Sequence, residues 1–242
     1  MMVSKKALLN SFKQFMVQIY KDAMLILLCI APLLAGSVFK FGIPFAQELI
    51  YEYFGLTKLF VPYYLLFDLL LGSLTPLLYC FAAAYVVLGE IDDGISGYLS
   101  VTPLGKRGYL ISRLGFPAVI SFVVSIVLMM VFSLSDFALP YIVGIALSSN
   151  LLGIIEALLV VSLSSNRVEG MAVSKLTGLF FLGLPVPFFV EGSIQYLVFF
   201  LPSFWLAKFA IEKELLFLLT GVLVSLVWIF MLNKKFNRKI NK

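Results

Sequence analysis

Histidine is absent from the 242 residues of this chain, and charged residues make up only 13% of it. Histidine is the commonest metal ligand and the commonest general base, so its absence removes most metal sites and the serine–histidine arrangements of hydrolases. The Gly-x-x-x-x-Gly-Lys-Ser/Thr loop that binds nucleotide phosphates is missing too. The chain therefore cannot hydrolyse ATP by that route, and we predict that it is not an enzyme.

Cysteine is equally scarce. Cys29 and Cys80 both lie inside apolar stretches, where we expect buried thiols and neither a disulfide nor a metal pair. The 18 Lys and Arg exceed the 13 Asp and Glu by five. We interpret this excess as basic residues that flank membrane helices and hold their orientation. We expect no nucleic-acid partner and no cofactor or metal bound by this chain.

Apolar residues are abundant: they make up 62% of the chain, whose mean hydropathy is +1.05. A soluble domain is about 45–50% apolar and about 25% charged. This composition excludes a soluble enzyme, a disordered chain and a disulfide scaffold. Since a spanning helix needs about 20 apolar residues, we predict an all-α membrane protein with six transmembrane helices.

The charge pattern divides the chain into three parts. Residues 1–22 alternate basic and apolar groups at helical spacing, which predicts an N-terminal interfacial helix. Residues 23–232 form the membrane domain, and residues 233–242 form a basic tail. The apolar piece 194–207 is too short to span, so we expect a re-entrant segment before span six. The predicted spans are about 23–41, 59–88, 114–134, 140–163, 172–190 and 215–232.

The basic residues also predict orientation. With six spans and a cytoplasmic N-terminus, 14 of the 18 Lys and Arg fall on the inner side. Positive charge is enriched in cytoplasmic segments. We therefore expect a multi-pass protein of the plasma membrane with both termini in the cytoplasm.

Segment 89–113, between spans two and three, has the most informative pattern. Ile91, Ile95, Tyr98 and Leu99 would share one face of a short helix. An amphipathic helix at the cytoplasmic surface needs a groove to fill. The alternative is a solvated loop whose charges only end the two helices.

This segment resembles the first cytoplasmic loop of ABC-2 type transporter permeases. The matching residues are Glu90, Asp92, Asp93, Gly94, Leu99, Thr102, Pro103, Lys106, Arg107 and Tyr109. Ile91 departs from the family pattern, which usually has a basic residue there. The likeness extends to the interfacial N-terminal helix, the six spans and the broken apolar segment before the last span.

The resemblance implies that the segment is a coupling helix, docked on a separately encoded ATP-binding ABC subunit that holds ATP and Mg. Two permease copies, identical or different, would assemble with two ATPases, and export would be the usual direction. The residues expected to couple to the ATPase are Glu90, Asp92, Asp93, Gly94, Ile95, Tyr98, Leu99, Thr102, Pro103 and Arg107.

Two acidic residues lie inside predicted spans: Asp68 in the second and Glu156 in the fourth. A carboxylate at the bilayer centre costs about 2.5–3.5 kcal/mol on insertion scales, so both should face the bundle interior, a partner or water. They are candidates for lining a transport pathway or relaying protons. The structural alternative is hydrogen bonding between helices.

We therefore predict the permease subunit of an ABC transporter that exports a hydrophobic or amphipathic compound: a drug, an antimicrobial peptide or a lipid-like molecule. One alternative is a proton-coupled secondary transporter that uses Asp68 and Glu156. The other is a non-transporting membrane scaffold or immunity protein.

Overall fold

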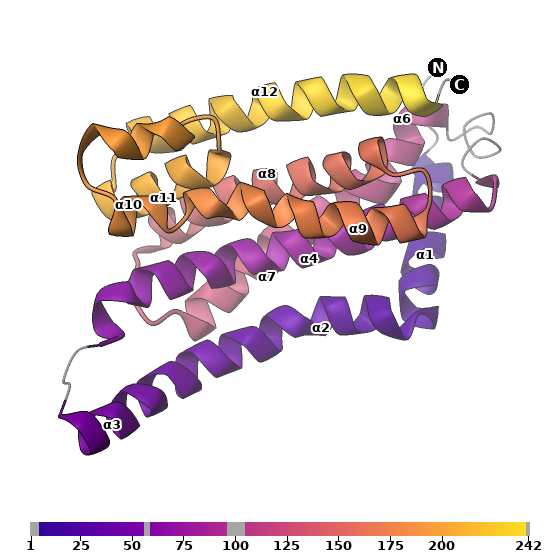
Figure 1. The fold of residues 1–242 in the computed structure, drawn as a ribbon. Coiled ribbons are helices and arrows are strands. Elements are labelled where there is room, and N and C mark those ends of the chain that lie inside the picture. Colours follow the sequence, from indigo (N-terminus) through magenta and orange to yellow (C-terminus); the bar gives the residue numbers. More distant parts are fainter. Residues whose placement is uncertain (1–4, 56–58, 96–104, 241–242) are drawn as a thin grey trace.

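The structure is a computed structural model that describes residues 5–55, 59–95 and 105–240. Every regular element within these ranges is helical (Figure 1). The α-helices are α1 (Lys5–Lys21), α2 (Ala23–Ser37), α3 (Ile43–Phe54), α4 (Tyr64–Asp92), α6 (Gly105–Leu110), α7 (Phe116–Phe132), α8 (Leu139–Leu163), α9 (Arg167–Thr177), α10 (Val186–Phe189), α11 (Pro202–Glu212) and α12 (Leu215–Ile240). The π-helices are η1 (Val38–Gly42) and η3 (Ile111–Gly115), and the 3-10 helices are η2 (Val61–Tyr63), η4 (Gly178–Gly183) and η5 (Gly192–Val198).

Five helices in the described residues are long and apolar enough to cross a membrane, and the prediction of a multi-pass all-helical protein is confirmed. They cover Ala23–Phe54, Val61–Asp92, Gly108–Phe132, Leu139–Leu163 and Leu215–Phe236. The predicted first span, 23–41, continues through η1 into α3, because a π-turn carries the helix past Gly42 and Pro44 stands in the first turn of α3. The predicted fifth span, 172–190, is divided among α9, η4 and α10. The chain there runs beside α8 (Figure 1).

Helices α4 and α8 form the centre of the bundle. In each, 72% of the most apolar 18-residue stretch is buried. The corresponding share is 17% in α12 and in the continuous helix that runs from α2 into α3. The two lie parallel and close because small residues face each other: the Ser73 and Ser149 hydroxyls are 3.3 Å apart, and a Cβ on Gly153 would lie 2.6 Å from the Pro76 carbonyl oxygen. Small residues permit such close helix packing in membranes.

Pro76 interrupts the hydrogen bonding of α4 in the middle of the bundle. Because proline has no N–H, the carbonyl four residues earlier, on Gly72, loses its usual donor. The Ser125 hydroxyl of α7 donates to this carbonyl at 3.0 Å. The neighbouring helix thus replaces the missing bond, which allows α4 to continue to Asp92.

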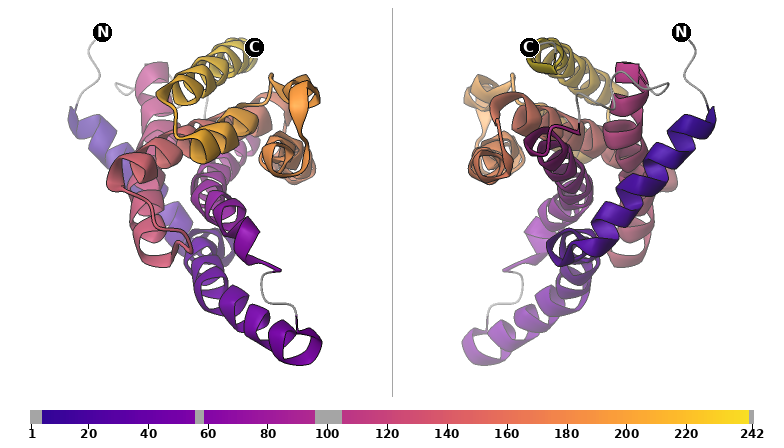
Figure 2. Two further views of the ribbon diagram at one scale, coloured as in Figure 1. Left: turned by 90° about the vertical axis from the view of Figure 1, so that its left-hand side faces the viewer. Right: turned by 90° about the vertical axis from the view of Figure 1, so that its right-hand side faces the viewer.

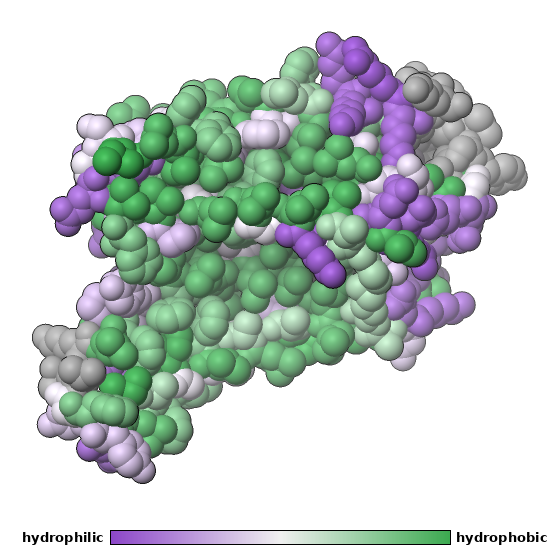
Figure 3. All heavy atoms as spheres, viewed as in Figure 1, coloured by the Kyte–Doolittle hydropathy of each residue, from purple (hydrophilic) through white to green (hydrophobic). Residues whose placement is uncertain are grey.

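Both described ends of the chain lie at one end of the bundle, which we call the terminal end (Figure 1). The other end, with α3, α10 and the start of α12, is the distal end. Apolar side chains cover the long sides, and hydrophilic side chains gather at the terminal end (Figure 3). This distribution fits a protein that crosses a bilayer along its long axis.

Residues 192–200 run along the surface of the bundle away from the distal end, and the largely buried α11 follows them. The Trp228 indole N–H donates to the Phe200 carbonyl at 2.9 Å. Trp228 lies 13 residues into α12, which is about 20 Å along the helix. Helix α11 then leads back toward the distal end, where Lys213 adopts a left-handed conformation with φ 58° before α12 begins.

Candidate functional site

A buried ion pair joins the two ends of segment 89–113 at the terminal end. Glu90 lies in the last turn of α4, and Arg113 lies in η3 at the start of the next span. The Arg113 Nη2 atom is 2.6 Å from Glu90 Oε1, and Nε is 3.0 Å from each carboxylate oxygen. The side chains are only 1% and 2% exposed. Such fork-like contacts are among the strongest charge-assisted hydrogen bonds.

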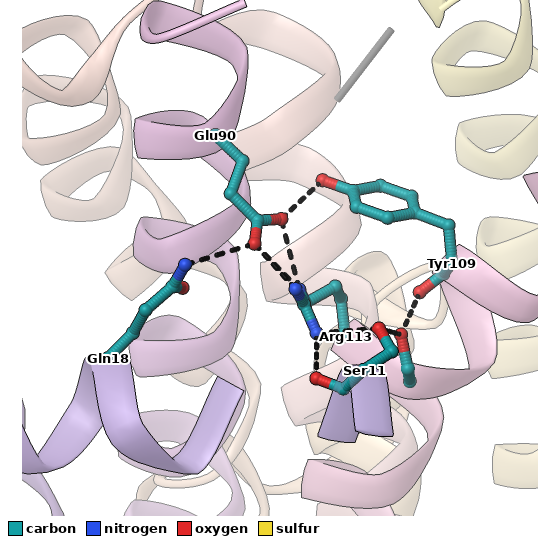
Figure 4. A network of polar contacts seen from close by, with 6 residues as sticks. Ser11, Gln18, Glu90, Tyr109 and Arg113 are labelled. Atoms are coloured by element: carbon teal, nitrogen blue, oxygen red, sulfur yellow. Dashed lines mark hydrogen bonds and ion pairs between the residues drawn. The ribbon is translucent and has the colours of Figure 1, made fainter. Parts of the chain in front are cut away.

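Helix α1 is tied to this ion pair. Arg113 Nη1 donates to the Ser11 carbonyl oxygen at 2.7 Å and to its hydroxyl at 3.1 Å. The amide of Gln18 donates to Glu90 at 3.3 Å, and the Ser11 and Ser112 hydroxyls are 3.0 Å apart. The predicted interfacial helix is therefore fastened to the base of segment 89–113 (Figure 4).

The Tyr109 hydroxyl completes the set by donating to Glu90 Oε2 at 2.9 Å. The terminal-end network thus consists of Ser11, Gln18, Glu90, Tyr109, Ser112 and Arg113. Buried charges are tolerated only when they are paired and hydrogen-bonded. The network meets this condition, and it joins α1, α4, α6 and η3 into one unit.

The structure places the predicted coupling residues in different surroundings. The Glu90 carboxylate lies inside the protein, whereas the side chains of Asp92, Asp93 and Ile95 are exposed. Gly94 has φ +70°, a conformation that glycine adopts easily and that ends α4. Tyr98, Leu99, Thr102 and Pro103 lie outside the described residues, as does the side chain of Arg107.

Arg167, which sequence reasoning did not single out, connects the start of α9 to the end of α4. Its backbone N–H donates to Asp92 Oδ2 at 3.0 Å, and its guanidinium lies 5.1 Å from the centre of the Tyr85 ring. A Cβ on Gly89 would lie 1.9 Å from Arg167 Nη2. Glycine at position 89 thus allows the arginine to cross α4.

An open hollow of about 560 Å³ lies beside the terminal-end network. Polar side chains of α1, including Lys13 and Gln14, line one side. Glu90, Arg113 and the exposed Ile95 line the other. The hollow therefore adjoins the end of α4, where segment 89–113 leaves the bundle.

Asp68 is 1% exposed and is used to hold a turn. Its two carboxylate oxygens accept hydrogen bonds from the backbone N–H groups of Leu134 and Ser135 at 2.7 and 2.8 Å. The Lys40 ammonium donates to the carbonyl of Ser133 in the same turn at 2.9 Å. Asp68 thus bonds to the backbone of the connection between α7 and α8, and not to another helix.

Glu156 is 6% exposed and lies in the C-terminal half of α8. Its Oε1 atom lies 2.9 Å from the hydroxyl of Thr177, the last residue of α9. The single proton of this hydroxyl is shared between Oε1 and the Ser174 carbonyl oxygen, which lies 2.6 Å away. Its Oε2 atom is buried and has no hydrogen-bond partner within the described part of the chain. The two intramembrane acids therefore differ in how many of their carboxylate oxygens are hydrogen-bonded within the described residues.

These features define a multi-pass helical membrane protein, and no group of metal-ligating side chains occurs among its described residues. The family of Rv2686c-like proteins, described as fluoroquinolones export permease proteins, matches residues 15–233. The chain therefore belongs to this family, and the prediction of a membrane permease is confirmed.

Two relatives come from Mycobacterium tuberculosis. They are the fluoroquinolones export permease proteins Rv2686c of strain H37Rv and MT2760 of strain CDC 1551. Each is 26% identical to this chain over 231 residues, which cover 91% of the chain and 90% of the relative. No solved structure matches the chain. The likeness thus extends over nearly the whole length of both proteins.

Proposed function

We propose that this chain is the transmembrane subunit of a drug exporter, driven by ATP hydrolysis with Mg on a separate ABC subunit. The observation that carries the proposal is the family match over residues 15–233, together with relatives named as fluoroquinolones export permeases. The chain has no phosphate-binding loop of its own. Energy for export must then come from a partner or from an ion gradient.

The terminal-end network supports the ATP-driven version. Segment 89–113 would dock on the ATPase, as the resemblance to ABC-2 permeases implies. Because Glu90 and Arg113 clamp its two ends together, a force on the segment acts on α4 and η3 at once. The bonds from Arg113 to Ser11 pass the same force to α1. The hollow between α1 and Ile95 offers room for a partner side chain or helix.

The remaining parts of the assembly follow from this proposal. Both termini and the terminal end face the cytoplasm, residues 192–212 are re-entrant from the outer side, and a second permease copy completes the pathway. The substrate is a hydrophobic or amphipathic compound of the fluoroquinolone type. This chain binds no nucleotide, and its role is transport.

A mild-detergent pull-down of the tagged protein from its native membranes tests the partnership. We expect a stoichiometric ATP-binding subunit, identified by mass spectrometry, and its loss on Leu99→Asp. Val168→Asp is the matched control: it adds the same charge at the terminal end, on a side chain that is 78% exposed in the first turn of α9. Recovery of the protein alone, or loss of the subunit from both variants, would contradict the proposal.

Cellular accumulation of a fluoroquinolone, followed by its own fluorescence, tests export. We expect cells that express the chain with its ATPase to accumulate less drug than cells with Leu99→Asp. Proton-coupled transport is the second candidate, and it is favoured by the buried Oε2 atom of Glu156, which has no hydrogen-bond partner in the part of the chain that the structure describes. Export that persists without the ATPase and stops with a protonophore would select that candidate.

A further inference from the structure

The carboxyl group of Glu156 is buried in the bundle, and only one of its two oxygens has a hydrogen-bond partner among the described residues. Oε1 is bonded to Thr177, whereas Oε2 is buried without a partner in the described residues. Leaving a buried polar atom unpaired is costly, and each such atom in a native structure needs an explanation. Inside a membrane an ionisable side chain of this kind usually marks a functional site.

Asp68 provides an internal comparison. It is as deeply buried as Glu156, but both of its oxygens are bonded to backbone N–H groups. Each Asp68 oxygen thus already has a donor from the turn between α7 and α8. Glu156 can accept a donor without losing the bond from Thr177.

Helix α9, whose last residue Thr177 contacts Glu156, is held to α4 at its start by Arg167 and buries few residues along its length. The buried residues of α9 are Gly170 and Thr177, and both are small. The helix lies at the periphery of the bundle (Figure 2). Directly after Thr177 the chain changes to the 3-10 helix η4, and a Cβ on Gly178 would meet nothing within 4 Å. A 3-10 stretch within a longer helical segment often marks a hinge.

Aromatic and apolar groups surround this part of α8. Ile155 and Leu159 belong to a buried cluster against which Phe180 and Trp228 pack. The two aromatic rings are 4.9 Å apart and nearly perpendicular. An aromatic drug can lie on such a surface, and aromatic faces also attract a cation.

We propose that Glu156 binds the protonated amine of a cationic or zwitterionic amphiphile, which reaches the Oε2 atom when α9 and η4 move aside. The proposal rests on the proposed function and specifies its substrate class. The amine supplies an N–H donor to Oε2, which has no donor among the described residues. The apolar part of the amphiphile contacts Phe180 and Trp228. The site would then discriminate between otherwise similar drugs by the presence of a basic amine.

Direct binding to the purified protein tests the proposal. Two fluoroquinolones serve as probes: ciprofloxacin, which carries a basic amine, and flumequine, which has none. We expect the wild type to bind ciprofloxacin, and Glu156→Gln to weaken that binding about tenfold or more, the range for loss of one charged hydrogen bond. Flumequine binding should change less than about twofold on the same scale. Glu156→Asp keeps the charge and should keep the preference for ciprofloxacin.

Four results would overturn the proposal: no ciprofloxacin binding by the wild type, no change on Glu156→Gln, an equal loss for both drugs, or loss of the preference in Glu156→Asp. Equal thermal stability of wild type and Glu156→Gln excludes a folding defect as the cause of weakened binding. Because binding is measured without transport, a wild type that binds ciprofloxacin but exports neither drug would refute the proposed function and leave the site intact. If a protonophore stops wild-type export and Glu156→Gln abolishes export of both drugs, Glu156 is assigned to proton coupling and amine recognition is overturned.

Discussion

Removing the arginine of the terminal-end network should strongly destabilise the protein. Arg113→Met deletes five hydrogen bonds, three to Glu90 and two to Ser11, and leaves a carboxylate that is 2% exposed. Breaking a buried ion pair by removing one partner costs about 3–5 kcal/mol. At about 2–4 °C per kcal/mol for a chain of this length, the melting temperature in detergent should fall by roughly 6–20 °C.

A double variant separates the buried charge from the rest of the effect. Glu90→Gln combined with Arg113→Met leaves no buried charge and keeps an acceptor for the Tyr109 hydroxyl. We expect the double variant to recover at least about half of the lost stability, because an uncompensated charge accounts for most of the cost. A double variant no more stable than Arg113→Met would refute this reasoning.

Limited trypsin digestion reports on the attachment of α1. Both variants lose the two bonds to Ser11, so cleavage at the exposed Lys13 should be faster in both, even where the melting temperature recovers. Cleavage at the exposed Lys175 of α9 should be unchanged and serves as the internal reference. Unchanged cleavage at Lys13 would show that the ion pair does not hold α1.

Three further substitutions test the connection between α7 and α8, which Asp68 holds, and the close packing of α4 against α8. Asp68→Asn should lower the free energy of unfolding by about 1–3 kcal/mol, because the amide nitrogen that replaces one oxygen cannot accept from a backbone N–H group. A thermal melt measures this loss. Binding of ciprofloxacin and flumequine at saturating concentration should persist. Gly153→Ala should cost about 1–3 kcal/mol, because the new Cβ would lie 2.6 Å from the Pro76 carbonyl oxygen. Gly178→Ala has free space and should not destabilise the protein; equal melting temperatures for the two glycine variants would refute the packing argument.

Local composition was sufficient to predict most of the membrane helices. A run of about 20 apolar residues has no stable place in water, so hydropathy alone indicates where spans lie. Helix breaks were harder to predict, because they depend on which neighbour supplies the missing hydrogen bond. The Ser125 hydroxyl replaces the hydrogen bond that α4 loses at Pro76, and the helix continues. Residues 172–190 are also apolar, but they divide into three short helices.

The sequence alone identified the membrane class, the two intramembrane acids and the segment that resembles a coupling helix. Only the tertiary structure decided what the charged residues do. Glu90 and Arg113 are 23 residues apart in the chain, and the folded helices alone bring them to 2.6 Å. Asp68 and Glu156 look alike in sequence, but both Asp68 oxygens accept from backbone N–H groups, whereas the Oε2 atom of Glu156 has no hydrogen-bond partner among the described residues. Hydropathy is a local property of the sequence. The hydrogen-bond partners of a buried charged residue depend instead on how distant segments pack together in the low-dielectric interior.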